Sequence, residues 1–170
     1  MKSILLFGTL FFALTACSQQ DKSKRPSPPD SLSVTLNNGT AVSINYSQPS
    51  VKGRTIGKDL EPMAGRVWRT GANEATVFEV NKNVKIEGKD LPAGKYGLFT
   101  IANGNDWIII FNKTWNQWGA FDYKEADDAL RVNVKSGKAP QFAEQMKFQI
   151  SKEGVVTLLW GDIMVGFKVE

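Results

Sequence analysis

The stretch Leu32-Ser-Val-Thr-Leu-Asn-Asn-Gly-Thr-Ala-Val-Ser-Ile-Asn-Tyr46 decides the fold class. Apolar residues alternate with polar ones on both sides of the dipeptide Asn38-Gly39. Alternation with a period of two is typical of a half-buried strand, because successive side chains point to opposite faces of a sheet. Asn-Gly favours a two-residue hairpin turn, whose central residues need positive φ. The sequence therefore predicts a β-hairpin over residues 32–46.

The same short period continues to the end of the chain, with turn residues between the apolar segments. Further strands are predicted at residues 76–81, 84–86, 96–101, 107–111, 130–134, 146–151, 155–160 and 163–169. Only residues 123–129 and 140–145 could form a helical turn or two. The expected fold is all-β, an antiparallel β-sandwich or jelly-roll-like single domain with at most one or two short helical turns.

The N-terminus has the pattern of an exported lipoprotein. A positive start is followed by a short apolar run and by Leu14-Thr-Ala-Cys17, which resembles the lipobox of bacterial lipoproteins. We therefore expect a signal peptide at residues 1–16 and lipid on Cys17. A polar, proline-rich and disordered tether would follow up to residue 30, and one domain would fill residues 31–170.

This reading places the protein in the bacterial envelope, held to a membrane by the lipid on Cys17. Ser18, where an aspartate would stand in an inner-membrane lipoprotein, favours the outer membrane over the inner one. Lys22, Lys24 and Arg25 fit a solvated spacer, and contact with anionic headgroups is the alternative.

The composition excludes most familiar catalytic machinery. The chain contains no histidine, and its single cysteine is Cys17. Histidine bases, cysteine nucleophiles, thiolate metal sites and disulfides are then unavailable to the acylated protein. We expect no cofactor and no bound metal, and we assign no catalytic residue. The net charge of +4 falls to +3 without Lys2, so nucleic acid is not an expected partner.

Four longer motifs resemble one family of secreted bacterial proteins. They are YSQPSVKGR (residues 46–54), VWRTGANEAT (67–76), LPAGKYGLFTI (91–101) and FNKTWNQWG (111–119). The chain resembles the family called "domain of unknown function 2911" over almost all of the predicted domain. The resemblance implies an exported domain and carries over no activity and no catalytic residue.

The segment of residues 66–76 is the first candidate binding site, because it interrupts the strand pattern with polar groups around Gly71. Polar side chains fixed on a loop beside a buried tryptophan are typical of ligand sites. The candidate residues are Arg54, Trp68, Arg69, Asn73 and Glu74. A structural role is the alternative, with Arg69 and Glu74 paired to each other or to Arg54, and Asn73 binding loop backbone.

A second candidate lies at Asn112, Trp115 and Trp118, where aromatic and amide side chains alternate. Aromatic faces beside amides suit sugars and peptides. The alternative is that these rings, with Phe121 and Tyr123, close one end of the core.

Three functions remain open from the sequence. The first is a lipid-anchored binding or accessory domain without catalysis, whose ligand would be a glycan, a peptide or an envelope protein. The second is a glycan hydrolase that uses two carboxylates. The third is a structural lipoprotein packed against a partner. The acids considered for a carboxylate pair are Glu61, Glu74, Asp122, Glu125, Asp127 and Asp128. The last four of these are also considered for Ca²⁺.

Overall fold

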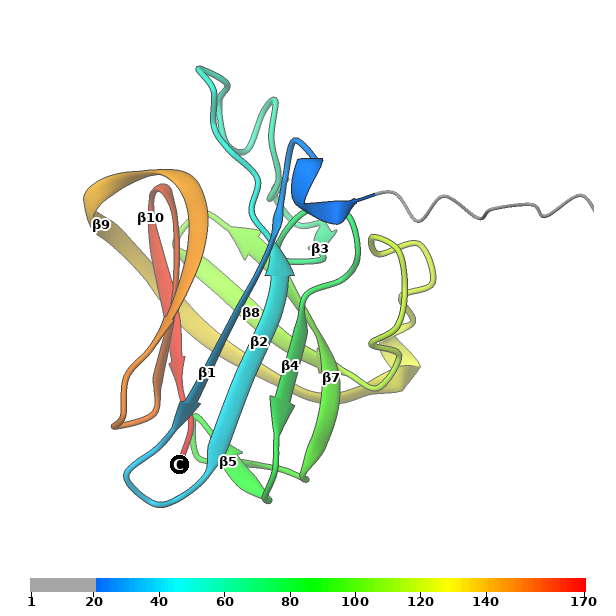
Figure 1. Ribbon diagram of the computed structural model, residues 1–170, viewed down its shortest axis with the longest axis vertical. Coiled ribbons are helices and arrows are strands. Elements are labelled where there is room, and N and C mark those ends of the chain that lie inside the picture. Colours follow the sequence, from blue (N-terminus) through cyan, green and yellow to red (C-terminus); the bar gives the residue numbers. More distant parts are fainter. Residues whose placement is uncertain (1–20) are drawn as a thin grey trace, which may run out of the picture.

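The computed structural model describes residues 21–170, which are almost entirely β structure (Figure 1). The predictions on Cys17 and the signal peptide lie outside these residues. Within them, no helix is long and apolar enough to cross a membrane. The strands are β1 (Pro29–Thr35), β2 (Ala41–Ser47), β3 (Val67–Trp68), β4 (Val77–Val80), β5 (Val84–Ile86), β6 (Lys89–Leu91), β7 (Gly94–Asn103), β8 (Asp106–Asn112), β9 (Asp128–Ile150) and β10 (Val155–Lys168), and the two 3₁₀ turns are η1 (Lys22–Lys24) and η2 (Glu125–Asp127). The all-β class is confirmed.

The main sheet is antiparallel, in the order β1-β2-β4-β7-β8-β9-β10, with β3 added beside β7. The opening hairpin is confirmed: β1 pairs with β2 up to Thr35 and Ala41, and Gly39 turns the chain with a φ of 78°. The last four strands follow each other as a meander, as predicted. The short strands β3 and β6, of two and three residues, were not predicted.

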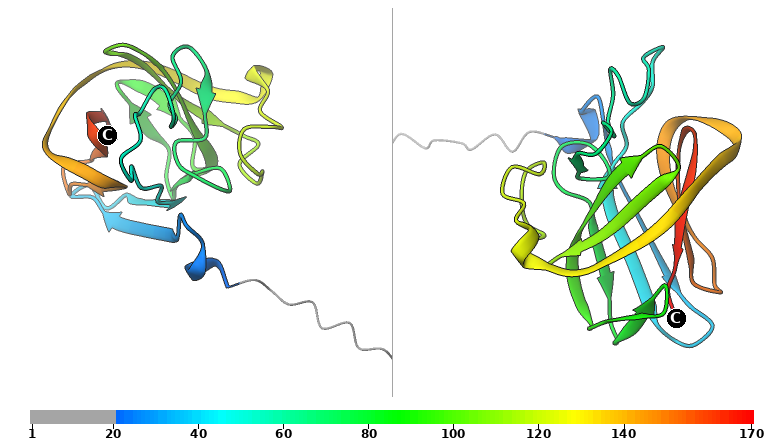
Figure 2. Two further views of the ribbon diagram at one scale, coloured as in Figure 1. Left: turned by 90° about the horizontal axis from the view of Figure 1, so that it is seen from above. Right: turned by 180° about the vertical axis from the view of Figure 1, so that it is seen from behind.

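The sheet curls until its last strands face its first ones, which gives the molecule its sandwich-like form (Figure 2). Aromatic rings from both ends of the sheet pack together in the interior. The ring centroids of Phe78 (β4) and Phe167 (β10) are 5.9 Å apart, and those of Tyr46 (β2) and Phe148 (β9) are 4.9 Å apart. The Tyr46 hydroxyl also accepts a hydrogen bond from the backbone N–H of Phe148. One continuous core therefore joins the two ends of the sheet.

Strand β9 corrects the prediction for residues 130–151. The sequence analysis expected two strands with a possible helical turn at residues 140–145, whereas residues 128–150 form one long strand. Its first part pairs with β8 and its second part with β10. This pairing overrides the local preference of residues 140–145, so the strand bends over the core without a break.

Strand β10 corrects a second prediction, since Gly161-Asp162 does not end a strand. Residues 155–168 form one strand, whose register with β9 shifts on both sides of Gly161. Gly161 has a φ of 59°, and a Cβ there would lie 2.5 Å from the side chain of Ile56. A glycine is therefore required at this bulge, where the sheet bends.

The segment before residue 31 is the third difference. The sequence analysis expected a disordered tether up to Asp30, but β1 already begins at Pro29 and η1 forms at Lys22–Lys24. The backbone N–H of Gln48 donates to Pro28 O at 2.9 Å. Residues 21–30 thus pack on the domain, because they find hydrogen-bond and charge partners there.

Candidate functional site

The loop between β3 and β4 is folded by its own hydrogen bonds. Trp68 is buried, and its indole N–H donates to Gly71 O at 3.0 Å. The hydroxyl of Thr76 donates to Thr70 O at 2.8 Å, which closes the loop from the other side. Thr70 and Asn73 both take the left-handed backbone conformation. Local bonds therefore close this loop on itself.

A cavity of about 180 Å³ lies beside this loop, and three of the predicted binding residues line it. We call it the Arg69 pocket. Its apolar walls include Trp68, Leu60 and Trp160, and the Trp160 indole N–H donates to Glu61 O at 2.8 Å. The lining residues are Ser27, Pro49, Arg54, Leu60, Glu61, Trp68, Arg69, Gly71, Ala72 and Trp160.

Arg69 is the polar group of this pocket that is left without a partner. Its Nε atom is buried and has no hydrogen-bond partner within residues 21–170. Burial lowers the pKa of Arg69, and the charge of Glu61 acts in the opposite direction. Leaving a buried charged donor without an acceptor costs about 1–3 kcal/mol or more, so the site favours an incoming acceptor.

Arg54 lines the same pocket but its guanidinium is already bonded. It donates from Nε to Val51 O at 3.1 Å and from Nη2 to Ser50 O at 2.7 Å. Because these bonds fix the loop that follows β2, Arg54 shapes the pocket and has fewer donors left for a ligand.

Glu74 and Asn73 bind the N-terminal segment, and the suggested pairing of Glu74 with Arg69 or Arg54 is wrong. Both Glu74 oxygens accept hydrogen bonds from Arg25 Nη1, at 3.0 and 2.9 Å, and Lys22 lies 3.0 Å away. The Asn73 side chain donates to Ser27 O at 2.9 Å. These two residues therefore hold residues 22–27 on the domain.

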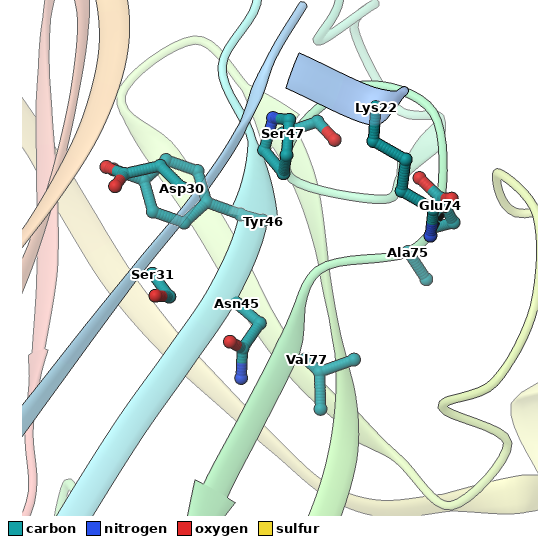
Figure 3. A pocket seen from close by; sticks show the side chains of 10 residues that line it. Lys22, Asp30, Ser31, Asn45, Tyr46, Ser47, Glu74, Ala75 and Val77 are labelled. Carbon is teal, nitrogen blue, oxygen red and sulfur yellow. Dashed lines mark hydrogen bonds and ion pairs between the residues drawn. The ribbon is translucent and has the colours of Figure 1, made fainter. Parts of the chain in front are cut away.

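A larger groove of about 410 Å³ lies between η1 and the outer face of strands β1, β2 and β4 (Figure 3). Figure 3 shows Lys22 beside Glu74 at one end and Asp30 beside Tyr46 at the other. The Tyr46 hydroxyl donates to Asp30 at 2.7 Å, and burial together with this carboxylate raises the pKa of Tyr46 to about 12. The charged groups of this groove already have partners, so the groove offers a ligand less than the Arg69 pocket does.

Two carboxylates, Asp30 and Glu74, line this groove, but Glu74 does not suit acid catalysis. Partial burial acts to raise its pKa, but hydrogen bonds from its own backbone amide, Arg25 and Lys22 prevail and lower the pKa to about 2. A glycosidase needs one carboxyl that is still protonated near neutral pH. Glu74 is ionised there and serves as an anchor for cations.

The second candidate group divides into buried and exposed residues. Asn112 is fully buried, donates to Lys124 O and Asp128 Oδ1, and accepts from the Thr114 N–H. It therefore organises the loop that follows β8, and its assignment as a ligand contact is wrong because solvent does not reach it.

The aromatic residues of the same loop do not close the core, apart from Tyr123. Trp115, Trp118 and Phe121 are 38%, 51% and 82% exposed. Tyr123 packs against Phe99, with ring centroids 5.1 Å apart. Core packing is thus wrong for three of the four rings.

The acidic residues near η2 are used in an ion-pair network. Arg131 contacts Asp128 and lies 3.2 Å from Glu125, while Tyr123 donates to Asp128 at 2.8 Å. Across residues 21–170, no three His, Cys, Asp or Glu side chains are grouped so that they could hold a metal ion. The carboxylates of this region stabilise the start of β9.

The sequence comparison assigns the family. Residues 27–169 match the family described as "Protein of unknown function (DUF2911)". The chain belongs to this family. The matched span begins at Ser27 and contains every residue that lines the Arg69 pocket. No curated protein and no solved structure matches the chain.

Sequence reasoning missed several walls of the pocket. Ser27 falls in the predicted tether, Pro49 and Leu60 lie in loops, and Trp160 belongs to a predicted strand. Their separation along the chain gives no local signal that they meet. The one available signal was the pair of tryptophans, Trp68 and Trp160, each of which needs a partner for its indole N–H when buried.

The Glu74 ion pairs predict a pH dependence of stability. The folded-state pKa of about 2 lies below the ordinary value of 4.5, so this contribution is complete above pH 4.5 and disappears as the pH falls towards 2. Because Glu74 is partly exposed, we expect Glu74→Gln to lower the free energy of unfolding by only about 1 kcal/mol at pH 7. The measurement is urea unfolding of both proteins between pH 7 and pH 2.5.

The control for this experiment is Glu79→Gln, which removes a surface ion pair with Lys95 at 3.5 Å. Its effect should be smaller at pH 7. A difference between wild type and Glu74→Gln that is the same at pH 7 and pH 2.5 would contradict the assignment of the ion pairs.

Proposed function

We propose that this protein is a lipid-anchored binding domain of the bacterial cell envelope, without catalytic activity, which holds a carboxylate group of its ligand in the Arg69 pocket. The observation that carries the proposal is Arg69, a half-buried residue that lines the cavity and whose buried Nε has no hydrogen-bond partner within residues 21–170. The lipobox-like Leu14-Thr-Ala-Cys17 supports the anchor.

A carboxylate fits this pocket better than a phosphate. The planar guanidinium of arginine matches the two oxygens of a carboxylate, and such charge-assisted bonds are about twice as strong as neutral ones. Glu61 lines the same pocket and its charge would oppose a ligand that carries two negative charges. The Trp68 and Trp160 walls suit the carbon atoms attached to the carboxylate.

The size of the pocket limits it to the end of a larger molecule. Pockets that enclose a whole drug-sized ligand measure about 300–1,000 Å³. The Arg69 pocket measures about 180 Å³, so it has room for one terminal group. An acidic sugar of an envelope glycan and the C-terminal residue of a peptide both provide such a group.

The test is a thermal-shift screen of the soluble chain Ser18–Glu170. Each carboxylate is paired with its own neutral amide, for example N-acetyl-D-alanine, N-acetylmuramic acid and glucuronic acid with their amides. A carboxylate at 100 times its Kd stabilises the fold by about 2.7 kcal/mol, which raises the Tm by several degrees. The amide should give no shift.

The peptide and sugar members of the panel identify the source of the carboxylate. Equal shifts with an acid and its amide, or no shift with any carboxylate, would overturn the proposal. Inorganic phosphate is included, and a larger shift with phosphate than with the carboxylates would also contradict it.

A further inference from the structure

The loop between β8 and η2 exposes large apolar side chains on the outside of the domain. Phe121 is 82% exposed and Trp118 is 51% exposed. Aromatic rings of this size normally lose most of their exposure on folding, because they carry much of the burial energy. Two exposed rings on one short loop indicate a surface that contacts a protein or a membrane.

This loop is held rigidly against its neighbours. The Gly119 N–H donates to Asn73 O at 3.0 Å, and the Ala75 N–H donates to Gln117 O at 3.0 Å. A β-bridge joins Trp118 to Glu74. The loop between β3 and β4, which borders the Arg69 pocket, therefore holds the loop with the exposed rings in a fixed place.

The N-terminal segment lies directly beside these rings. The Arg25 guanidinium sits 5.7 Å from the centre of the Trp118 ring and is paired with Glu74. Figure 1 shows the loop rising next to η1, and the view from behind in Figure 2 shows the same neighbours. The rings and the start of the described chain thus share one face of the molecule.

Charged side chains of both signs surround the rings. Lys22 and Lys24 of η1 are exposed, as are Lys113 and Lys124 at the two ends of the loop. Residues 21–25 and 113–124 contain five cations and two carboxylates, but Glu74 pairs with Lys22 and Arg25, and Asp21 lies 3.9 Å from Lys24. Cationic residues attract an anionic lipid surface by about 1 kcal/mol each when they lie close to it.

The distance to the anchor is short. Cys17 precedes Asp21 by four residues, and a fully extended chain spans about 3.6 Å per residue, or about 14 Å here. Because Lys22 and Arg25 are bound to Glu74, this length is all that separates the lipidated residue from the face with Trp118.

We propose that the face formed by Lys22, Lys24, Trp118 and Phe121, here called the aromatic face, rests on the lipid headgroups when Cys17 is acylated. This inference depends on the anchor proposed above. Tryptophan prefers the membrane–water interface, where its ring is shielded and its N–H stays wet. The occupant is a lipid surface, since the rings, the cations and the attachment point lie together.

The test uses the lipidated full-length protein, purified from bacterial membranes and reconstituted into vesicles of phosphatidylcholine with some phosphatidylglycerol. Lipids brominated near the headgroup end of the acyl chain quench tryptophans that touch the interface. Trp68, Trp107 and Trp160 are almost fully buried, so they contribute little to the quenching. We expect quenching that falls by more than half in Trp118→Phe and falls less in the matched control Trp115→Phe.

A second variant protects the test against misfolding. Phe121→Ser changes the most exposed ring of this loop and should leave the fold intact, while reducing the quenching of Trp118. Unchanged near-ultraviolet circular dichroism of the buried aromatics checks the fold of each variant.

Flotation of the protein with the vesicles separates the two proposals. Protein that floats but shows no quenching, or the same quenching in Trp118→Phe, would overturn the aromatic face and leave the anchor intact. In that case we would assign the exposed rings to a contact with a protein partner. Protein that does not float would overturn the anchor and the aromatic face together.

Discussion

Replacing Phe111 with alanine is expected to lower the free energy of unfolding by about 3–5 kcal/mol. Phe111 of β8 is fully buried, and its ring centroid lies 5.0 Å from Phe78, 5.4 Å from Phe167 and 6.4 Å from Tyr96. These partners come from three other strands, β4, β10 and β7. Removing the ring leaves a cavity between both ends of the curled sheet, which closely packed neighbours cannot fill. A domain of this size is stable by only about 5–15 kcal/mol in total.

The measurement is chemical unfolding followed by tryptophan fluorescence. The control is Phe142→Ala, because Phe142 is 54% exposed and its loss should change the stability by less than about 1 kcal/mol. A loss in Phe111→Ala no larger than in the control would show that the core is not packed around Phe111.

Replacing Arg69 with methionine is expected to weaken carboxylate binding by about 10- to 100-fold, because a charged hydrogen bond contributes about 1.5–3 kcal/mol. The same change should leave the Tm of the free protein unchanged or raise it. Arg69 has a buried Nε without a partner in the described chain, and methionine fills a similar length without a charge. A gain in stability with a loss of binding is what a functional residue shows.

The binding is measured by calorimetry with the carboxylate that gives the largest thermal shift, and the stability by thermal unfolding without ligand. Arg66→Met is the matched control, since Arg66 is an exposed arginine on the other side of the short strand β3. It should change neither quantity. A fall of several degrees in the Tm of Arg69→Met with unchanged affinity would assign Arg69 to the fold and remove it from the site.

The fold class was predictable because period-two alternation reports burial on one face of a sheet. The hairpin over residues 32–46 formed as expected, and so did the turn at residues 152–154, but the turn predicted at Gly161-Asp162 did not. The long strands β9 and β10 were not predictable as single elements. Gly161 is a turn signal in the sequence, but in the sheet it supplies a bulge, and only pairing with β9 decides between the two.

Only part of the grouping of the candidate residues was predictable. Arg54, Trp68 and Arg69 meet at one pocket, as the sequence analysis grouped them. Glu74 was grouped with them, but it binds Arg25, which lies 49 residues earlier in the chain. A contact between residues so far apart in the chain depends on how the sheet places the two segments. The sequence around each residue does not predict it.

The ion pairs that hold the N-terminal segment also determine how the domain resists force. A pull on the N-terminus first loads the contacts of Lys22 and Arg25 with Glu74. Once they part, the load reaches β1, which is the edge strand and pairs only with β2 in the sheet order. Its bonds would open one after another from Pro29, as in a zipper. Glu74 therefore holds the N-terminal segment in place, and its charge sets how strongly the first strand is protected from being peeled off the sheet.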